Sequence, residues 1–303
     1  MMSGASLARA AHFTPLRYPG GKAKLSLFVK RLVEMNGLLD GEYVEPYAGG
    51  AAIAVELLLQ DYISKIHIND ISRPIFAFWK SVLDHTDELS RLVKDTPLSI
   101  RSWDRQKKVF AARDNHDDVE VGFATFFLNR TNRSGILNGG MIGGREQNGV
   151  WKINARYNAQ DLVMRIQAIA RLRKQIHLSQ TDALEFLRKK ITKLPDNALI
   201  YLDPPYFEKG KALYYDFYQR SDHERVAQFV QGRVRRPRWI VSYDNVTAIR
   251  KLYVDCRSIT YNIGYSARER RDGAEVMFFS NGLKIPPLMG SMSRVSKRSR
   301  SVA

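Results

Sequence analysis

Residues 41–70 carry the pattern that most limits how this chain can fold. The segment GEYVEPYAGG predicts a strand that ends in a glycine turn, and AAIAVELLLQ, which follows directly, has the composition of a buried helix. SKIHIND then predicts a second strand. A strand, a glycine turn, a helix and a strand within about thirty residues make a βαβ unit, so the two strands are expected to lie parallel in one sheet.

The same pattern returns in the last third of the chain. IHLSQTDALEFLRKK predicts a strand, a turn and a helix, and NALIYLDPPY predicts a buried strand that stops at two prolines. RWIVSYDN predicts a further strand, and SITYNIGY and AEVMFFS are expected to form an antiparallel pair at the end of the sheet. The fold class predicted is therefore α/β, with a mostly parallel sheet and an antiparallel strand near its C-terminal end.

Between these two regions the sheet pattern is interrupted. Apolar residues recur at helical spacing in PIFAFWKSVLDHTDELSRLVK, VEVGFATFFLNR and NAQDLVMRIQAIARLRKQ. A long loop rich in Gly, Asn and Arg, TNRSGILNGGMIGGREQNG, separates the last two. We expect residues 76–175 to form a mainly helical insertion in a discontinuous domain made of residues 13–75 and 176–287. Residues 288–303 are expected to be a basic, disordered tail.

The charge of the chain indicates the class of its partner. Lys and Arg number 48 against 31 Asp and Glu, a net charge of +17. This excess suits a partner of dense negative charge, nucleic acid first, although a cationic surface kept for solubility is the alternative. No apolar run approaches the roughly 18 residues of a membrane helix, and MMSGASLARA lacks the apolar stretch of a secretion signal. With a single cysteine, Cys256, we expect no internal disulfide, no membrane and a cytoplasmic location.

Two motifs at predicted strand ends favour a nucleoside-containing cofactor, because ligands of open α/β sheets bind at the carboxyl ends of the strands. The glycines of EPYAGG let a ligand approach the main chain, although Gly49 and Gly50 alone are no dinucleotide fingerprint. Asp70, at the end of HIND, is placed where a carboxylate can accept two hydrogen bonds from a ribose diol. A tight turn and a helix-capping aspartate are the alternative explanation.

A third strand-end motif, LDPPY, points to an amine as the substrate. The prolines carry no N–H, so the carbonyls beside them are acceptors without competing donors. The Asp203 carboxylate and the Pro204 carbonyl can accept both hydrogens of an exocyclic amine, which returns electron density to its nitrogen. Tyr206 offers a ring on which a base can stack, worth ~1–3 kcal/mol. Alternatively, the prolines only end the strand and the tyrosine only packs.

Taken together, the motifs resemble those of one family. RYPGGK, VEPYAGGAA, HINDIS, FFLNRTNRSG, TDAL, LDPPY and VSYDN occur in the order found in the Dam-like adenine methylases, over roughly residues 13–285. The resemblance implies a Rossmann-like methyltransferase sheet, S-adenosylmethionine as cofactor with no metal, and methylation of adenine in double-stranded DNA. An Asp that opens the DPPY tetrapeptide favours adenine, whereas relatives that act on the cytosine amine more often carry Ser.

The same resemblance implies roles for individual residues. Lys22 pairs with the cofactor's methionine carboxylate, Asp70 holds its ribose, and Asp182 contacts its adenine. Tyr47 and Ala51 stand where many relatives have Phe and Gly, a departure that removes no charged or hydrogen-bonding contact. The catalytic set is Asp203, Pro204, Pro205 and Tyr206, and the cofactor-binding set is Tyr18, Lys22, Glu45, Pro46, Gly49, Asp70, Asp182 and Asp203. Asp203 is expected to act as an acceptor and positioner, since the amine becomes acidic once methylated.

The loop NRTNRSGILNGG is the best candidate for contacting DNA, which must be opened because a paired base is reached only by flipping it out. Arg130 and Arg133 can pair with phosphates or guanine edges. Asn129, Asn132 and Asn138 can serve adenine edges, and an ordinary solvated loop is the alternative. The further expectations are a monomer and a cognate restriction endonuclease as a second partner.

Other functions stay open at this point. The same pocket could methylate a cytosine amine or RNA, or the chain could be a catalytically silent DNA-binding relative. The intact DPPY tetrapeptide together with Lys22, Asp70 and Asp182 argues against a silent relative. The histidines do not stand at metal-ligand spacing with acids or cysteine, and Cys256 lacks the setting of a thiolate nucleophile.

Overall fold

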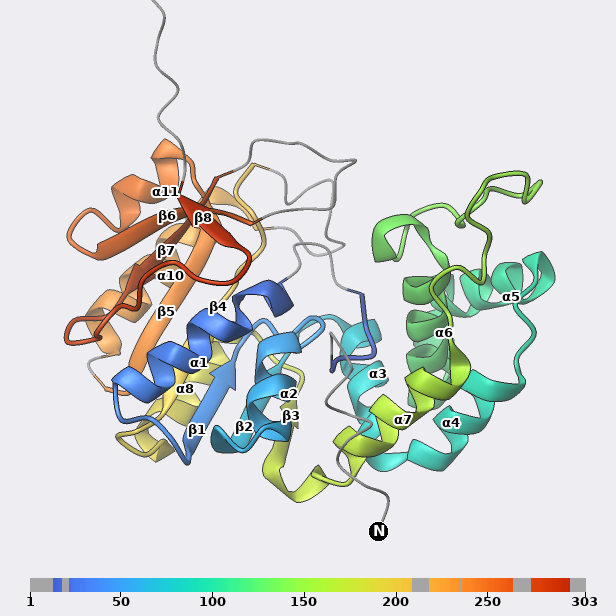
Figure 1. The fold of residues 1–303 in the computed structure, drawn as a ribbon, viewed down its shortest axis with the longest axis horizontal. Helices are drawn as coiled ribbons and strands as arrows, with labels where there is room; N and C mark the ends of the chain where they lie inside the picture. Colours follow the sequence, from blue (N-terminus) through green and yellow to red (C-terminus); the bar gives the residue numbers. More distant parts are fainter. Residues whose placement is uncertain (1–12, 18–21, 209–217, 235, 264–273, 295–303) are drawn as a thin grey trace, which may run out of the picture.

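The structure is a computed structural model of the 303-residue chain. It describes residues 13–17, 22–208, 218–234, 236–263 and 274–294. Within these ranges one eight-stranded sheet is covered by helices on both faces, and a group of helices lies beside it (Figure 1). The predicted α/β fold class is confirmed.

The sheet is parallel over five strands and antiparallel over the rest. Its order is β3-β2-β1-β4-β5-β7-β6-β8. From β1, successive strands of the chain are added on one side as β2 and β3, and the chain then crosses to the other side for β4 and β5. The order in which strands are added therefore reverses between the parallel strands β1 and β4, and such a switch point is where open α/β sheets bind ligands. The parallel strands are β1 (Gly41–Glu45), β2 (Ile63–Asn69), β3 (Ile176–Ser179), β4 (Leu199–Leu202) and β5 (Arg238–Asp244). The antiparallel strands are β6 (Arg257–Ile263), β7 (Glu275–Phe279) and β8 (Met292–Arg294).

The central strands are apolar on both sides because both faces of the sheet are covered. All four residues of β4 are buried. Tyr201 belongs to the cluster beneath α1 (Ser26–Met35) and α2 (Ala52–Leu59). Its neighbours Ile200 and Leu202 point to the opposite cluster, which is covered by the remaining helices of the sheet. Those helices are α8 (Ala183–Lys190), α10 (Arg220–Arg233) and α11 (Thr247–Leu252).

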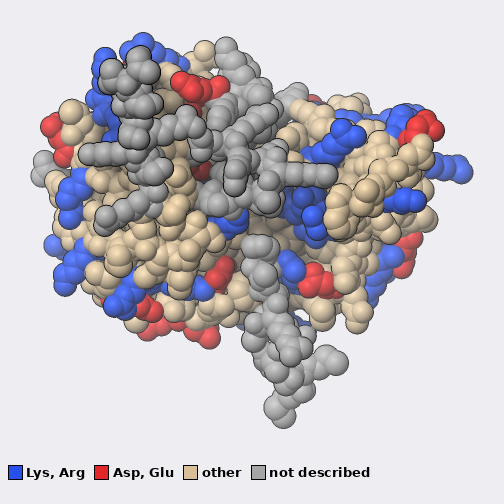
Figure 2. All heavy atoms as spheres, turned by 45° about the horizontal axis from the view of Figure 1, so that its top comes forward, with Lys and Arg blue, Asp and Glu red and all other residues tan. Residues whose placement is uncertain are grey.

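The helical region forms around α6 (Asp118–Thr131). All but three of its fourteen residues are buried, as expected for a helix surrounded by others. The helices packed around it are α3 (Arg73–Asp84), α4 (Thr86–Asp95) and α5 (Ile100–Ala111), and α7 (Ala159–Ala170) packs on α3 and α4. Short 3-10 turns occur at Lys22–Leu25 (η2), Arg113–Asn115, Arg133–Gly135, Arg173–Gln175 and Ile191–Lys193. Lys and Arg side chains gather on both parts of the face shown in Figure 2.

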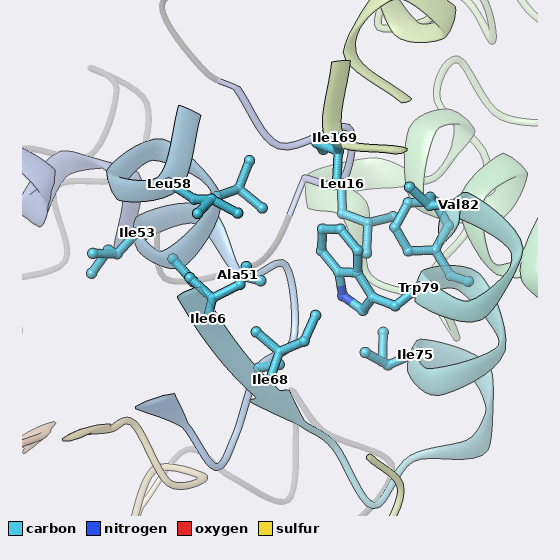
Figure 3. Packing of buried hydrophobic residues seen from close by; sticks show 14 of the residues in the cluster. Leu16, Ala51, Ile53, Leu58, Ile66, Ile68, Ile75, Trp79, Val82 and Ile169 are labelled. Carbon is cyan, nitrogen blue, oxygen red and sulfur yellow. The ribbon is translucent and has the colours of Figure 1, made fainter. Parts of the chain in front are cut away.

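A continuous apolar core joins the helical region to the sheet. Figure 3 shows Ile66 and Ile68 of β2 on one side and Ile75 and Trp79 of α3 on the other, all members of one buried cluster. The indole of Trp79 also donates a hydrogen bond of 2.9 Å to the carbonyl of Gly49 in the turn after β1. The helical region is therefore anchored directly to the glycine turn.

Two details at the predicted domain boundaries differ from expectation. The first helix of the helical region begins at Arg73, within the segment assigned to the sheet domain. The prediction of a disordered tail from residue 288 is wrong for Met292–Arg294, which pair with β6 as strand β8. The rest of the tail, 295–303, lies outside the described residues. We keep the division into a discontinuous sheet domain and a helical insertion as a proposal. No described helix has the length and apolar character needed to cross a bilayer.

Candidate active site

A cavity of about 790 Å³ lies at the carboxyl ends of the parallel strands, against the helical region. Its wall is built from the segment before α1, the turn after β1, the ends of β2, β3 and β4, and the loop after α6. It therefore occupies the switch point of the sheet. The predicted cofactor residues that line it are Lys22, Glu45, Pro46, Gly49, Asp70, Asp182 and Asp203. Tyr18 lies outside the described residues.

Asp70 fixes the conformation of the turn after β1 through a hydrogen bond to its main chain. The main-chain N–H of Gly49 donates to Asp70 Oδ2 over 2.8 Å, and that of Ser72 donates to Oδ1 over 3.0 Å. The turn ends at Ala51, which has φ of +42° and begins α2. This left-handed conformation explains why Gly suits the position, since it carries no Cβ to strain.

Asp182 caps helix α8. Its Oδ1 accepts hydrogen bonds of 3.0 Å from the main-chain N–H groups of Leu184 and Glu185. The residue also lines the cavity, so capping fixes its carboxylate at the cavity wall. The predicted contact with the cofactor's adenine stays a prediction.

Asp203, at the end of β4, is anchored by one oxygen. Its Oδ1 accepts a 2.6 Å hydrogen bond from Ser242 Oγ and lies 3.1 Å from Lys22 Nζ. Ser242 Oγ is itself 2.8 Å from the hydroxyl of Tyr201. No hydrogen bond from a described residue reaches the second oxygen, Oδ2, and 21% of the side chain is exposed. Burial raises the pKa of Asp203, although Lys22 and Ser242 oppose the change.

Lys22 is neutralised within the chain. Its ammonium lies 3.1 Å from Asp203 Oδ1 and 2.9 Å from Glu275 Oε2. Burial alone would lower the pKa of Lys22, but the two carboxylates outweigh it and hold the pKa well above its usual value. The ammonium already faces two carboxylates, and its predicted pairing with the cofactor's carboxylate stays a prediction.

The segment after Asp203 is fixed by two acids that sequence reasoning missed. Asp244 accepts hydrogen bonds from the main-chain N–H groups of Phe207, over 2.9 Å, and Glu208, over 3.0 Å. Glu275 accepts one of 2.7 Å from the hydroxyl of Tyr206, whose side chain is 8% exposed. The spacing of Ser242 and Asp244, two apart in VSYDN, was the available signal, because it puts both on one face of β5. Glu275 gave none, since only the strand order brings β7 to this edge.

Two of the asparagines predicted to read DNA are buried and satisfied internally. Asn129 accepts from the N–H of Arg17 over 2.7 Å and donates to the carbonyls of Arg17 and Gly135. Asn132 accepts from the indole of Trp103 over 2.7 Å and donates to two loop carbonyls. Neither amide is accessible, so the prediction of base contacts is corrected for both. They shape the loop, and Arg133 and Asn138 are exposed on it.

Arg130 belongs to a group of arginines at the cavity wall. Burial and, after it, the charges of Arg17 and Arg165 lower the pKa of Arg130 to about 9. One buried nitrogen of each of these three side chains, Arg17 Nη1, Arg130 Nε and Arg165 Nε, has no hydrogen-bond partner among the described residues. Asp161 pairs with Arg165 over 2.8 Å, so cations remain in excess. This arrangement suits an anion.

Comparison with known proteins shows which enzyme family this site belongs to. The profile of the D12 class N6 adenine-specific DNA methyltransferases matches residues 18–267. The chain belongs to this family. A relative is the Type II methyltransferase M.MjaIII of Methanocaldococcus jannaschii, 26% identical over 263 residues that make up 78% of this chain and 86% of that protein.

As a D12-class enzyme, the protein is an adenine-specific DNA methyltransferase that uses S-adenosylmethionine. The cavity fits such a cofactor: it joins the glycine turn, the Asp70 carboxylate and the Asp182 carboxylate in one wall. Among the residues described, no group of three or more His, Cys, Asp and Glu could hold a metal ion. Independence from metals stays a prediction.

Glu45 gives the site a measurable pH dependence. Burial raises the pKa of this carboxyl to about 8, against a weaker opposing hydrogen bond from the N–H of Ala54. The folded protein therefore binds a proton that the unfolded chain releases above its ordinary carboxyl pKa, and stability falls as pH rises towards 8. Glu45→Gln should remove this loss, which is at most ~1.4 kcal/mol per pH unit.

We expect the melting temperature of Glu45→Gln to exceed that of the wild type at pH 8, and the gap to shrink towards pH 5. Thermal unfolding of both proteins without cofactor measures it. Glu185→Gln, a change to an exposed carboxylate paired with Lys189, is the matched control. A gap that is constant with pH would contradict the assignment.

Proposed function

We propose that the protein flips adenine out of duplex DNA and methylates its exocyclic amine at the tetrapeptide from Asp203 to Tyr206. The observation that carries the proposal is the asymmetric anchoring of Asp203. Ser242 and Lys22 fix Oδ1, and Oδ2 has no partner among the described residues. A carboxylate held in this way presents one oriented acceptor to a ligand in the cavity.

The chain's own groups prepare the amine for attack. Asp203 Oδ2 accepts one amine hydrogen and the carbonyl of Pro204 accepts the other, which favours a pyramidal nitrogen with an available lone pair. S-adenosylmethionine, when bound, supplies the electrophilic methyl group. Asp203 receives the proton that the methylated amine sheds, and its raised pKa helps it to do so. The ring of Tyr206 replaces part of the stacking that the flipped base loses.

The cofactor is proposed to bind along the switch point. Asp70 and Gly49 hold the ribose side, where the hydrogen bond between them leaves the carboxylate facing the cavity wall. Asp182 contacts the adenine side, and Glu45 and Pro46 form the floor between the two. We also keep Tyr18 as a proposed contact of the methionine side.

DNA contact is proposed through the arginines of the cavity wall and the loop after α6. A phosphate beside the flipped nucleotide would supply the negative charge that Arg17, Arg130 and Arg165 share. Arg133 and Asn138, which are exposed, are the proposed contacts to neighbouring groups of the duplex. The buried Asn129 and Asn132 support this surface from below.

Arg130→Ala should weaken DNA binding without regard to sequence. The loss of one phosphate contact is expected to reduce the slope of log affinity against log salt concentration by about 1. Folding should be unharmed, since the change relieves repulsion with Arg17 and Arg165. Fluorescence anisotropy over a series of salt concentrations measures the slope. The control is Arg236→Ala, an exposed arginine paired with Asp196 near the amino ends of β4 and β5, away from the cavity. An unchanged slope in Arg130→Ala would remove Arg130 from the interface.

Expression in a host without DNA methylation, followed by single-molecule sequencing, tests the function itself. The proposal predicts methylation on adenine N6 within one short DNA word. Modified cytosine, or methyl transfer to RNA alone, would replace adenine as the substrate. No modification together with intact DNA binding would favour the catalytically silent relative.

We further propose that the protein acts as a cytoplasmic monomer beside a restriction endonuclease of the same specificity. Support for the endonuclease comes from the relative M.MjaIII, which is a Type II methyltransferase. Plasmid DNA modified by this protein should resist cleavage in an extract of cells that carry its gene, and unmodified plasmid should be cut. Equal survival of both plasmids would speak against a partner nuclease.

A further inference from the structure

The buried carboxylate of Glu275 has no part in the function proposed so far. Glu275 is the first residue of β7 and is 4% exposed. Its Oε1 accepts a 2.7 Å hydrogen bond from the hydroxyl of Tyr206. Its Oε2 accepts one of 3.0 Å from the hydroxyl of Tyr261 and one of 2.9 Å from Lys22 Nζ. One carboxylate of β7 thus connects Tyr261 of β6 to the catalytic segment through Tyr206.

A carboxylate in this position is costly unless it is paired. Its neighbours along β7 are Val276, Met277 and Phe278, all buried and apolar. Transfer of a charged side chain from water to such apolar surroundings is unfavourable, so an apolar residue would be usual at this position of β7. Burial would raise the pKa of Glu275, but Lys22 and the two tyrosine hydroxyls outweigh it and hold the pKa below its usual value. The carboxylate is therefore ionised, and its negative charge is stabilised by Lys22 and by the two tyrosine hydroxyls.

The antiparallel direction of β7 delivers Glu275 to the active edge. β7 lies between β5 and β6 and runs against both. Its first residue therefore lies opposite Asp244, the last residue of β5. A parallel strand would place its last residue there instead. The antiparallel pairing of β7 with β5 thus accounts for an acid beside Tyr206.

We propose that Glu275 is a positioning residue for methyl transfer, which fixes the ring of Tyr206 through its hydroxyl and shares the ammonium of Lys22 with Asp203. This inference rests on the proposed function. The contact with Tyr206 restricts the tilt of the ring on which the base would stack. The contact with Lys22 sets how strongly the ammonium is drawn to Asp203, and so how much negative charge Asp203 keeps for the amine.

Loss of the Glu275 charge should therefore change Asp203 itself. With Glu275 neutral, Lys22 would pair with Asp203 alone, at a present separation of 3.1 Å. The negative charge of Glu275 also adds to the rise in the pKa of Asp203 that burial produces. Without it, Asp203 becomes a weaker acceptor that ionises at lower pH.

Several other titratable groups face Asp203, and their titration must be distinguished from that of Asp203 in a pH measurement. They are Lys22 from η2, Tyr43 and Glu45 from β1, Tyr201 from β4, Tyr243 from β5, Tyr261 from β6 and Glu275 from β7. The pKa values of the tyrosines in this set are raised well above the usual value, so they stay neutral across the working range. Glu45 titrates near pH 8, on the alkaline side, and is present in every variant compared.

The test compares Glu275→Gln, Tyr206→Phe and the double variant. Glu275→Gln keeps the shape and removes the charge, whereas Tyr206→Phe keeps the ring and the charge and removes the hydroxyl contact. Each single variant should lower kcat by about 10-fold or more, as expected when one hydrogen bond to a charged group is lost. The dissociation constant of S-adenosylmethionine, measured by calorimetry, should stay within a few fold. The double variant should lose less than the product of the single losses, because the two changes break the same hydrogen bond.

The pH–rate profile supplies a result that a purely structural role would not give. In Glu275→Gln the acid limb should move to lower pH, and in Tyr206→Phe it should move less. Tyr253→Phe, a buried tyrosine of the opposite cluster, is the matched control and should leave kcat and the profile unchanged. If Glu275→Gln does not fold, Tyr206→Phe still decides, because it leaves the pair between Lys22 and Glu275 in place.

Wild-type kcat in folded Glu275→Gln, or in Tyr206→Phe, would overturn the inference. So would losses that multiply in the double variant with an unmoved acid limb. A wild-type protein that binds the cofactor and DNA but transfers no methyl group would instead refute the proposed function. The two failures are therefore distinguishable.

Discussion

Asp203→Asn is expected to slow methyl transfer by about 10²- to 10³-fold, the range seen when one preorganised electrostatic contact to the transition state is lost. The anchored oxygen of Asp203 lies 3.1 Å from Lys22 and 2.6 Å from Ser242 Oγ. An amide that keeps its oxygen there must present its NH₂ group to the target amine, which replaces an acceptor with a donor. Single-turnover methyl transfer on DNA that carries the mapped word measures the change.

Binding measurements separate this effect from a loss of affinity. DNA affinity of Asp203→Asn should stay close to that of the wild type, because the proposed phosphate contacts lie on the arginines. Asp196→Asn makes the same change at an exposed aspartate, 80% accessible, and should transfer at the normal rate. Normal turnover in Asp203→Asn would remove the carboxylate from the mechanism.

Lys22→Met is expected to cost the protein about 3–5 kcal/mol of stability as well as its activity, because it removes the cation that compensates two buried carboxylates. Asp203 and Glu275 lie 3.1 Å and 2.9 Å from the ammonium that is lost. Without it their pKa values must rise, so each takes up a proton in the folded state at higher pH than in the unfolded chain. Stability of the variant therefore falls as pH rises above the ordinary carboxyl range.

The difference in melting temperature between wild type and Lys22→Met should thus be large at pH 8 and smaller at pH 5. Thermal unfolding at both values measures it. Lys189→Met, which removes an exposed ammonium paired with Glu185, serves as the control and should shift the melting temperature little. A deficit that does not depend on pH would mean that the two carboxylates are not paired through Lys22.

The parts of the fold that local sequence determines were predicted well. The βαβ unit of residues 41–70 is present as β1, α2 and β2, because apolar strand composition and a glycine turn act over a few residues. The antiparallel pairing of β6 with β7 was also expected from adjacent strand-like segments. The third C-terminal strand, β8, was missed because Met292–Arg294 is short and polar and gains its structure only by pairing with β6.

The site was predictable where it depends on strand ends and not where it depends on strand order. LDPPY ends β4 and lines the cavity through Asp203 and Pro205, as its prolines indicated. Ser242, Asp244 and Glu275 come from β5 and β7, and their meeting at Asp203 and Tyr206 follows from a sheet order that no local pattern encodes. Asn129 and Asn132 were assigned to DNA because asparagine side chains can pair with adenine edges and both occur in NRTNRSGILNGG. Here the loop folds back on them and uses their amides as its internal supports.

The central claim is that Asp203 holds the target amine, and a binding cycle tests it most directly. Duplexes with adenine or with purine, which lacks the amine, at the target position are bound to the wild type and to Asp203→Ala in the presence of a non-reactive cofactor analogue. Comparing the adenine-to-purine affinity ratio in the two proteins cancels the different costs of flipping the two bases. We predict that this ratio is at least about 10-fold higher in the wild type, the worth of one hydrogen bond to a charged group. The same ratio in both proteins would contradict the account.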